Sequence, residues 1–522
     1  MFVKIFCSDC IQNMTSEEIK NKAFTGVIWS FINQFGTQIL AIVPAMVLAR
    51  LLSPSEYGIV AMAGIFNGLA FNLSTGGFSD ALLQKKDADH LDYCSVYYFN
   101  LFINSFFYLI FFFLAPYCAD FFDEPLVAPV MRVALLSLPL VAVGGVHAII
   151  LKRNLNFKAP ALRNIVVQAA SAIVAVVLAF VRCGVWALVI QGVMQTLGNS
   201  IINYYLCSWR PTLTFSMERL KSMFSYGVKI YISGLVNYGF GKATDTTVAK
   251  VYSPADLSFY NRAYSTANLF IHSFIGVINN VAFPAFARMQ GDVERLRRGV
   301  SRFVSMSSMI AFLLMALLFV LAEPLFNFMY SSKWDAVVPY FRIVCVWGLF
   351  QPVRSTLEGF LRATGCAGLI MYNRLINNIL LLGNVYLAWK FGITCMLYGQ
   401  VCLEILQICF FTHFTNRFYG YGVGSLLREN SVYIVPTLTI ALVAFVADYT
   451  VCRLLLLLPI NGEMLSSLFR LLFSGLISLS CFILFYRTLN WSAYRELIGL
   501  ASDVFGRRKP IIGKLLKKMV KK

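Results

Sequence analysis

The chain has 522 residues, of which 58% are hydrophobic and 13% are charged, and its mean hydropathy is +0.70. A water-soluble protein of this composition would lack the polar surface needed to cover its apolar residues, so the composition excludes that class and indicates a membrane protein with many spans. The net charge of +19 does not point to nucleic acid, because the basic residues lie in short loops and in the tail, where they orient a protein in the bilayer.

Fourteen apolar stretches along the chain are long enough to cross a bilayer, which takes roughly 20 mainly apolar residues. Their approximate limits are 25–48, 57–79, 95–116, 130–150, 164–181, 184–205, 223–246, 263–286, 303–321, 338–360, 370–389, 393–413, 431–449 and 464–486. The first stretch follows Lys20 and Lys22 and has no small-residue cleavage site behind it, so it is predicted to be a retained span and not a signal peptide. Whether residues 1–13 belong to the mature protein stays open.

Basic residues collect in alternate loops, which supports this number of spans independently. They are Lys20, Lys22, Lys85, Lys86, Lys152, Arg153, Lys158, Arg163, Arg210, Arg219, Lys221, Arg288, Arg295, Arg297, Arg298, Arg417 and Arg428. The opposite loops are poor in cations, and the loop that contains Asp120, Asp123 and Glu124 has none. The positive-inside rule then predicts an even number of spans and cytoplasmic termini, namely residues 1–24 and the basic tail at 487–522.

An internal repeat links the two halves of the chain. The hinge between two apolar stretches reads ARLLSPSE at 49–56 and AKVYSPAD at 249–256, and PVMR at 129–132 is echoed by PYFR at 339–342. Six spans separate the two copies of each motif, so both copies enter the membrane in the same direction, which predicts parallel repeats with a substrate site at their interface. The sequence therefore predicts an all-α polytopic fold with two six-helix lobes and two further helices, at residues 25–222, 223–414 and 415–486.

Ionisable residues inside the predicted spans mark a candidate site, because charges in lipid are costly and should face protein or water. Lys242 and Asp245 are three residues apart, and Arg354 and Glu358 are four apart, so each pair shares one helix face. Two interpretations stay open, a structural ion pair or a functional site; the absence of these charges from the first repeat favours function. Glu404 is a candidate proton or sodium site, or the partner of an Arg or Lys on a neighbouring helix.

Motifs of known enzymes are missing. The chain has no Gly-x-x-x-x-Gly-Lys-Ser/Thr phosphate loop, no His/Asp/Glu cluster at metal-binding spacing and no nucleophile elbow. No loop is long enough to hold a soluble catalytic domain. The sequence therefore predicts a transporter that is not an enzyme and needs no cofactor or bound metal.

Five stretches of the chain carry a resemblance to a known family. They are ARLLSPSEYG at 49–58, GGFSDALLQKK at 76–86, LKRNLNFK at 151–158, YNRAY at 260–264 and VAFPAFARMQ at 281–290. In these stretches the chain resembles the polysaccharide transporters, the O-antigen and colanic-acid type of lipid-linked oligosaccharide flippase, within the multidrug/oligosaccharidyl-lipid/polysaccharide exporter superfamily. The motifs cover the first eight or nine spans in order, and the last spans match only in hydropathy.

The resemblance implies two lobes around a central cavity that opens alternately to either face of the bacterial inner membrane. It also implies the substrate, a polyprenyl-diphosphate-linked oligosaccharide for lipopolysaccharide, capsule or exopolysaccharide, and further partners in polysaccharide polymerase and chain-length machinery. Residues that would bind this substrate are Lys242, Arg354 and Arg262, and those that would couple an ion or balance charge are Asp245, Glu358 and Glu404.

Two other functions remain as alternatives. A cation-coupled multidrug exporter of the same superfamily would be expected to carry carboxylates in the first six spans, which have none except Asp80 at an edge. A membrane-embedded glycan polymerase or ligase would be expected to have a long periplasmic loop with Arg or His residues, and no loop of that length is present. The sequence leaves the sugar, the coupling ion and the oligomeric state open.

Overall fold

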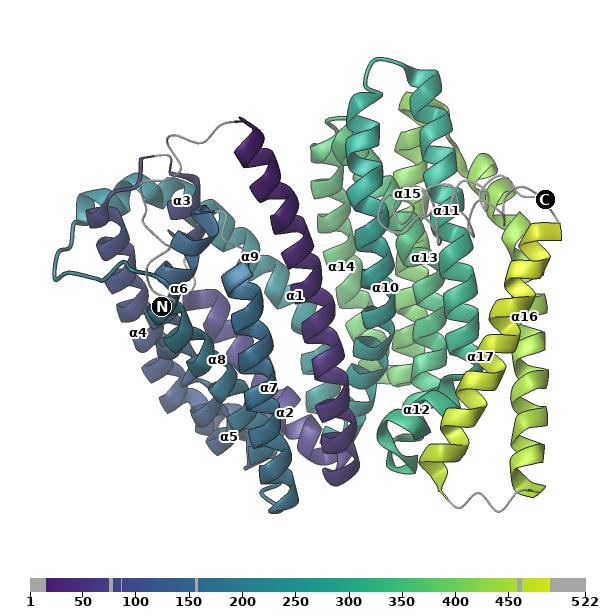
Figure 1. Ribbon diagram of the computed structural model, residues 1–522, viewed down its shortest axis with the longest axis horizontal. Coiled ribbons are helices and arrows are strands. Elements are labelled where there is room, and N and C mark those ends of the chain that lie inside the picture. Colours follow the sequence, from purple (N-terminus) through teal and green to yellow (C-terminus); the bar gives the residue numbers. More distant parts are fainter. Residues whose placement is uncertain (1–15, 75–77, 86, 155–157, 458–461, 489–522) are drawn as a thin grey trace. The chain divides into compact units, whose positions relative to one another are not determined.

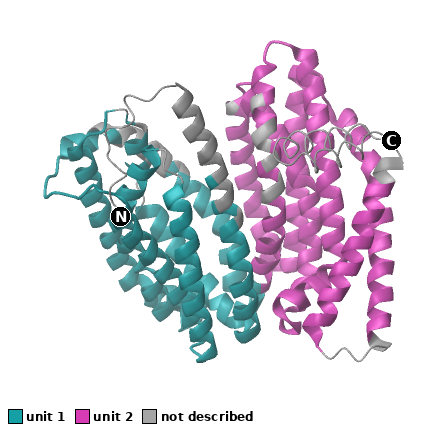
Figure 2. Ribbon diagram, in the orientation of Figure 1, with its two compact units in different colours: residues 1–258 teal, residues 259–522 magenta. Residues whose placement is uncertain are grey.

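The structure is a computed structural model that describes residues 16–488 except 75–77, 86, 155–157 and 458–461. Most of the predicted cytoplasmic N-terminus and tail therefore lies outside the described residues. Within the described part the chain forms helices and loops and contains no strand. It divides into two compact units, Met1–Ser258 and Phe259–Lys522 (Figure 2), each of which is described by itself.

Unit 1 is a bundle built from the first nine helices (Figure 1). They are α1 (Ser16–Leu51), α2 (Pro54–Ser74), α3 (Phe78–Gln84), α4 (His90–Phe122), α5 (Val127–Ala134), α6 (Ser137–Arg153), α7 (Lys158–Phe180), α8 (Trp186–Leu206) and α9 (Met217–Val251). Helix α7 packs between α1 and α8, α6 packs between α4 and α8, and α2 packs against α4, α5 and α9. The bundle thus joins helices that are distant in sequence.

Unit 2 contains the remaining helices, of which α10 begins in the last residues of unit 1. They are α10 (Pro254–Arg288), α11 (Val293–Val320), α12 (Ala322–Tyr330), a 3-10 turn (Ser332–Trp334), α13 (Val337–Ala363), α14 (Ala367–Phe391), α15 (Ile393–Tyr419), α16 (Val423–Leu457) and α17 (Glu463–Thr488). Helix α13 packs against both α11 and α15, which places it inside the unit, and α14 covers α15.

Each of the fourteen predicted spans overlaps a helix, although 130–150 is divided into α5 and α6 at Leu135 and Leu136, and 57–79 continues past the end of α2 at Ser74 into residues outside the described part. Among the described residues, eight helical segments are long and apolar enough to cross a membrane by length and composition. The prediction of an all-α, multi-pass membrane protein is therefore confirmed. The helices at the other six predicted spans are not among these eight, and the described apolar part of α1, Gly36–Leu51, is shorter than a span. The number fourteen therefore stays a prediction, as do the lobe limits near 222 and 414.

The repeated hinge forms the same helix cap in both copies. Glu56 accepts hydrogen bonds from the backbone N–H (2.7 Å) and the hydroxyl (3.0 Å) of Ser53 at the start of α2. Asp256 accepts the same two bonds from Ser253 at the start of α10, at 3.2 and 2.7 Å. Each serine hydroxyl in turn accepts a bond from the backbone N–H of its acidic residue, as in a capping box. The Ser-Pro-x-acid pattern therefore starts a helix twice.

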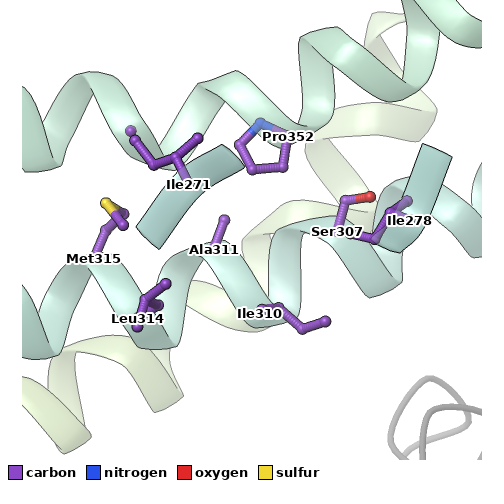
Figure 3. A pocket seen from close by; sticks show the side chains of 9 residues that line it. Ile271, Ile278, Ser307, Ile310, Ala311, Leu314, Met315 and Pro352 are labelled. Carbon is purple, nitrogen blue, oxygen red and sulfur yellow. The ribbon is translucent and has the colours of Figure 1, made fainter. Parts of the chain in front are cut away.

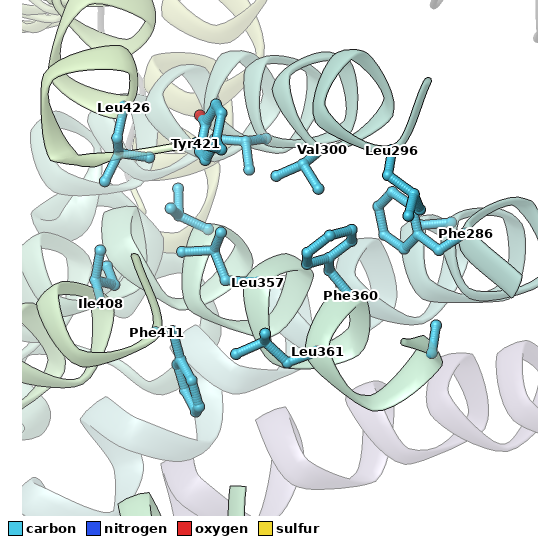
Figure 4. Close-up of a cluster of buried hydrophobic side chains, with 14 of the residues drawn as sticks. Phe286, Leu296, Val300, Leu357, Phe360, Leu361, Ile408, Phe411, Tyr421 and Leu426 are labelled. Carbon is cyan, nitrogen blue, oxygen red and sulfur yellow. The ribbon is translucent and has the colours of Figure 1, made fainter. Parts of the chain in front are cut away.

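The apolar core of unit 2 lies where α10, α11, α13 and α15 meet (Figure 4). Phe286, Phe360 and Phe411 are fully buried there, and the Phe286 ring meets the Phe360 ring edge-on at 5.2 Å. Burying aromatic side chains of this size removes a large apolar area from lipid and water and adds specific ring contacts. This core fixes α13 against α15, the two helices that carry the charges described below.

The last two helices of unit 2 pack against its other helices. Helix α16 lies against α11, and α17 lies against α16 and α12. Arg470 in α17 donates two hydrogen bonds to Asp448 in α16, at 2.9 and 2.7 Å, and one to Glu323 in α12 at 3.2 Å. A bidentate guanidinium–carboxylate pair has a defined geometry, so this contact holds α16, α17 and α12 together.

Candidate functional site

The charges predicted inside the second half of the chain meet around one arginine in unit 2. The guanidinium of Arg354 donates to Glu404 at 2.5 Å, to Glu358 at 3.0 Å and to Gln351 at 3.2 Å. The side chains of Arg354, Glu358 and Glu404 are 19%, 15% and 4% exposed. Charges this deeply buried are stable only when they are paired and hydrogen-bonded, and here α13 and α15 supply each other's counter-charge.

Helix α13 arranges these groups along one face. Gln351, Arg354, Glu358 and Arg362 follow at spacings of three or four residues, so successive side chains lie one turn apart. Glu358 also accepts a hydrogen bond from Arg362 at 2.6 Å, and Arg374 of α14 lies 3.6 Å from the same oxygen. Three guanidiniums therefore share two carboxylates. The cluster carries one positive charge in excess, which suits it to bind an anion.

Exposure increases along this cluster from the interior toward the helix end. The side chain of Arg354 is 19% exposed, whereas those of Arg362 and Arg374 are 52% and 57% exposed. Sequence reasoning missed Arg362, Arg374 and Gln351. The four-residue spacing from Glu358 indicates Arg362, but Arg374 lies on the next helix, where spacing along α13 carries no information.

Uncharged polar side chains continue from this cluster onto α14 and α15. Gln407 accepts a hydrogen bond from Asn373 at 3.3 Å and donates one to Asn377 at 3.0 Å. Gln400 donates to the hydroxyl of Tyr260 at 3.3 Å. Amide side chains offer both donors and acceptors, so this part of unit 2 can exchange hydrogen bonds with hydroxyl groups of a ligand.

The second predicted pair lies by itself in unit 1. Lys242 donates to Asp245 at 2.5 Å along one face of α9, with the lysine 41% and the aspartate 12% exposed. One turn earlier, Tyr238 of the same helix donates to the backbone carbonyl of Ile65 in α2 at 2.6 Å, which holds α9 against α2. The predicted cation is thus compensated by a carboxylate on its own helix.

Arg262, the third predicted cation, has aromatic neighbours. Its guanidinium carbon lies 4.8 Å from the ring centre of Tyr330 and 5.3 Å from that of Trp334, in a cation–π arrangement. Trp334 precedes α13 by three residues, and Arg354 lies 17 residues along α13 from Val337, a rise of about 25 Å. Arg262 therefore lies near the opposite end of α13 from the Arg354 cluster.

A small apolar pocket opens between α10, α11 and α13 (Figure 3). Ile271 and Ile278 line one wall and Leu314 and Met315 another, and Ser307 is the one polar residue that lines it. The Ser307 hydroxyl already donates to the carbonyl of Phe303 at 2.6 Å. The pocket has no convergent polar groups of the kind that orient a ligand, so the Arg354 cluster is the better candidate site.

The described helices form an all-α, multi-pass membrane protein, and the comparisons with known proteins place it in the class of polysaccharide transporters. The solved structure of the lipid II flippase MurJ in its inward closed conformation has the same fold: the TM-score is 0.67 at 16% identity, over 89% of this chain and 99% of that one. Residues 47–339, more than half of the chain, match the family described as polysaccharide biosynthesis protein. The chain therefore belongs to this family, as its motifs predicted.

Relatives of the chain include two named bacterial proteins. The lipopolysaccharide biosynthesis protein WzxC of Escherichia coli strain K12 is 23% identical over 351 residues, which is 66% of this chain and 70% of that protein. The succinoglycan biosynthesis transport protein ExoT of Rhizobium meliloti strain 1021 is 25% identical over 358 residues, which is 68% of this chain and 72% of that protein. Both names place the relatives in polysaccharide biosynthesis.

Proposed function

We propose that the protein is a flippase that moves an oligosaccharide linked to a polyprenyl diphosphate across the bacterial inner membrane by alternating access. Membership of the family, the names of the relatives and the fold shared with MurJ support this proposal. The observation that carries it in this chain is the Arg354 cluster, where three guanidiniums face two carboxylates within unit 2.

In this proposal the diphosphate competes with Glu358 and Glu404 for the guanidinium of Arg354. Arginine suits this exchange because its planar fork binds phosphate oxygens in pairs. The amides of Asn373, Asn377 and Gln407 then offer hydrogen bonds to sugar hydroxyls. Polysaccharide polymerase and chain-length proteins are proposed as partners downstream, and both termini are proposed to be cytoplasmic.

The multidrug-exporter alternative receives less support. A site for organic cations needs a carboxylate available to the ligand, whereas Asp245, Glu358 and Glu404 each already contact a cationic side chain at 2.5–3.0 Å. The polymerase or ligase alternative needs room for catalytic residues outside the membrane. Between the described helices the longest connection is 207–216, which is too short for a domain.

A paired substitution tests the proposal in cells that lack the native gene. In Arg354→Gln/Glu404→Gln, the central guanidinium is lost together with its most buried partner, while Glu358 keeps Arg362 and Arg374. We expect surface polysaccharide to fall at least about tenfold, as it would if roughly 1.4 kcal/mol of anion binding were lost, and lipid-linked oligosaccharide to accumulate in the cytoplasmic leaflet.

A matched control separates transport from folding. Lys250→Gln/Asp123→Asn removes an ion pair of the other unit in the same way, away from the residues proposed to bind the substrate. Both variants are measured for protein level in the membrane and for melting temperature after purification. Wild-type export by a folded Arg354→Gln/Glu404→Gln variant would contradict the assignment of the diphosphate site. An equal loss of export in the control variant would also contradict it, because the loss would then not depend on the Arg354 cluster.

A further inference from the structure

The connection between α8 and α9, residues 207–216, lies at the edge of unit 1 (Figure 1). Apolar side chains in and next to it are exposed. Leu213 is 94% exposed and Phe215 is 51% exposed, and Met217 at the start of α9 is 55% exposed. The three residues lie within five positions of the chain and are called the apolar row below. Single exposed apolar residues are ordinary, but three of them within five residues at one loop mark a surface that another apolar phase covers.

Hydrogen bonds to α4 fix the conformation of this loop. Trp209 donates through its indole N–H to Nδ1 of His90 at 2.9 Å, and Nε2 of His90 pairs with the hydroxyl of Thr212 at 2.8 Å. The backbone N–H of Ser216 donates to the hydroxyl of Ser95 at 2.9 Å. The loop is therefore anchored at three points between 209 and 216. The apolar row is part of a defined conformation.

Aromatic contacts hold the loop at residues 207–216 against the ends of the neighbouring helices. The Trp209 ring lies 5.2 Å from the ring of His147, six residues before the end of α6, and 6.0 Å from that of Tyr97 in α4. Tyr204, at the end of α8, lies 5.2 Å from His147. Tyr and Trp gather where a membrane protein crosses the boundary between lipid and water. The loop thus lies at interfacial depth.

Cations flank the apolar row. Arg219 is paired with Asp89 at 3.0 Å, and the backbone N–H of Asp92 holds the pKa of the Asp89 carboxyl below its usual value. Arg210 and Lys221 are exposed on either side of the row, and Glu218 is the one carboxylate between them. Arg210 donates to the backbone carbonyls of Cys207 and Trp209 and lies 4.1 Å from the ring centre of Tyr204, and none of these three partners is a carboxylate.

We propose that residues 210–221 bind the surface of an anionic bilayer, with Arg210 and Lys221 against lipid phosphates and the row of Leu213, Phe215 and Met217 inserted among the acyl chains. Amphipathic segments with this combination of cations and apolar residues lie in the plane of the membrane interface. A row of three side chains is far smaller than the roughly 1,000 Å² that a specific protein interface needs, which favours lipid over a protein partner. The proposal is independent of the transported substrate.

Photocrosslinking tests this proposal on the full chain in nanodiscs that contain equal amounts of phosphatidylglycerol and phosphatidylcholine. Benzoylphenylalanine replaces Leu213 in one variant and, as a control, Phe113 in another. Phe113 is 69% exposed and belongs to the apolar run of α4, 23 residues after its first residue. We expect lipid adducts at both positions by mass spectrometry. Adducts at position 213 should favour phosphatidylglycerol by about fivefold, whereas those at 113 should follow the composition of the nanodisc.

Charge removal completes the test. Adding Arg210→Gln and Lys221→Gln to the position 213 probe should abolish the preference for phosphatidylglycerol while the lipid adduct remains. An absence of lipid adducts at 213 in a sample that labels at 113 would overturn the proposal. So would adducts to protein, or a preference for phosphatidylglycerol that survives the loss of both cations.

Discussion

Glu358 controls how much positive charge the Arg354 cluster presents. It contacts Arg354, Arg362 and Arg374 at 3.0, 2.6 and 3.6 Å, so it is the one carboxylate common to all three guanidiniums. A ligand anion that enters the cluster competes with Glu358 for these partners. Glu404 differs from Glu358 in two ways. Its ion pair is with Arg354, the innermost of the three guanidiniums, and its side chain is almost fully buried.

Glu358→Gln is therefore expected to strengthen anion binding. The substitution keeps the shape of the side chain and leaves three guanidiniums against one carboxylate. Inorganic pyrophosphate should bind the purified protein about tenfold more tightly, equivalent to roughly 1.4 kcal/mol, as measured by isothermal titration calorimetry. Glu294→Gln, which removes an exposed carboxylate near the start of α11, serves as the control and should leave the affinity unchanged. Equal affinities in the two variants would refute the role of Glu358 as a competing anion.

Residue spacing predicts contacts within a helix but not between helices. The three-residue spacing of Lys242 and Asp245 and the four-residue spacing of Arg354 and Glu358 correspond to ion pairs in the structure. The pairing of Glu404 with Arg354 depends on α15 packing against α13, and several helices could have occupied that place. The sequence left two interpretations of Glu404, a proton or sodium site or a partner for an Arg or Lys on a neighbouring helix. The structure pairs it with Arg354, and the roles of these residues remain proposals.

Helix α6 approaches α8 closely at a glycine in unit 1. A Cβ atom added to Gly144 would lie 2.6 Å from Cα and 2.9 Å from Cβ of Ser200, whereas at Gly145 nothing lies within 4 Å. Small residues let helix backbones come together in membranes, where van der Waals packing replaces the hydrophobic effect as the driving force. The two neighbouring glycines therefore have different roles.

Gly144→Ala and Gly145→Ala form a matched pair that tests this packing. The first substitution forces α6 and α8 apart and should destabilise the protein by about 1–3 kcal/mol. The second should leave stability unchanged or raise it slightly, because alanine favours a helix over glycine by up to about 1 kcal/mol. Melting temperatures of both variants in detergent, followed by tryptophan fluorescence, provide the comparison. Similar melting temperatures would show that the close approach contributes nothing to stability.

Hydropathy located the helices of the spans because an apolar stretch of 20 residues is a strong signal, but it did not locate their ends. Helix α9 begins at Met217, before the predicted 223, with a Ser216 hydroxyl that accepts from the backbone of Arg219. Helix α11 begins at Val293 in the same way, with Asp292 as its cap. The helical turns that extend beyond the bilayer carry polar side chains, so hydropathy does not detect them, and only capping residues mark where such a helix begins. The short helices α3 and α12 fall below the length of a span and were missed for that reason.

Cations that the sequence assigns to opposite sides of the membrane lie at opposite ends of the helices of unit 1. At one end, Lys85 pairs with Asp92 at the start of α4, and Arg153 at the end of α6 donates to the carbonyl of Leu82. At the other end, Lys250 at the end of α9 pairs with Asp123, just after α4. Lys85 and Arg153, which the sequence predicts to be cytoplasmic, thus lie at the same end of the bundle, and the cytoplasmic position of that end stays a prediction of the positive-inside rule.

Reporter fusions to the full chain test this orientation. Green fluorescent protein fused after Lys522 should fluoresce, because it folds in the cytoplasm. Alkaline phosphatase inserted after Glu124, at the acidic end of unit 1, should be active, because it needs the oxidising periplasm to form its disulfides. The same enzyme inserted after Asp89 should be inactive, since α4 separates the two positions by one span. An active insertion at 89 with an inactive one at 124 would show that unit 1 has the opposite orientation in the membrane. A fusion at Lys522 that does not fluoresce, with both insertions as expected, would show that an odd number of spans follows Asp89.

Activity at both insertion sites would mean that α4 does not cross the membrane. The three fusions therefore test the orientation, the parity of the spans and the crossing of α4 separately.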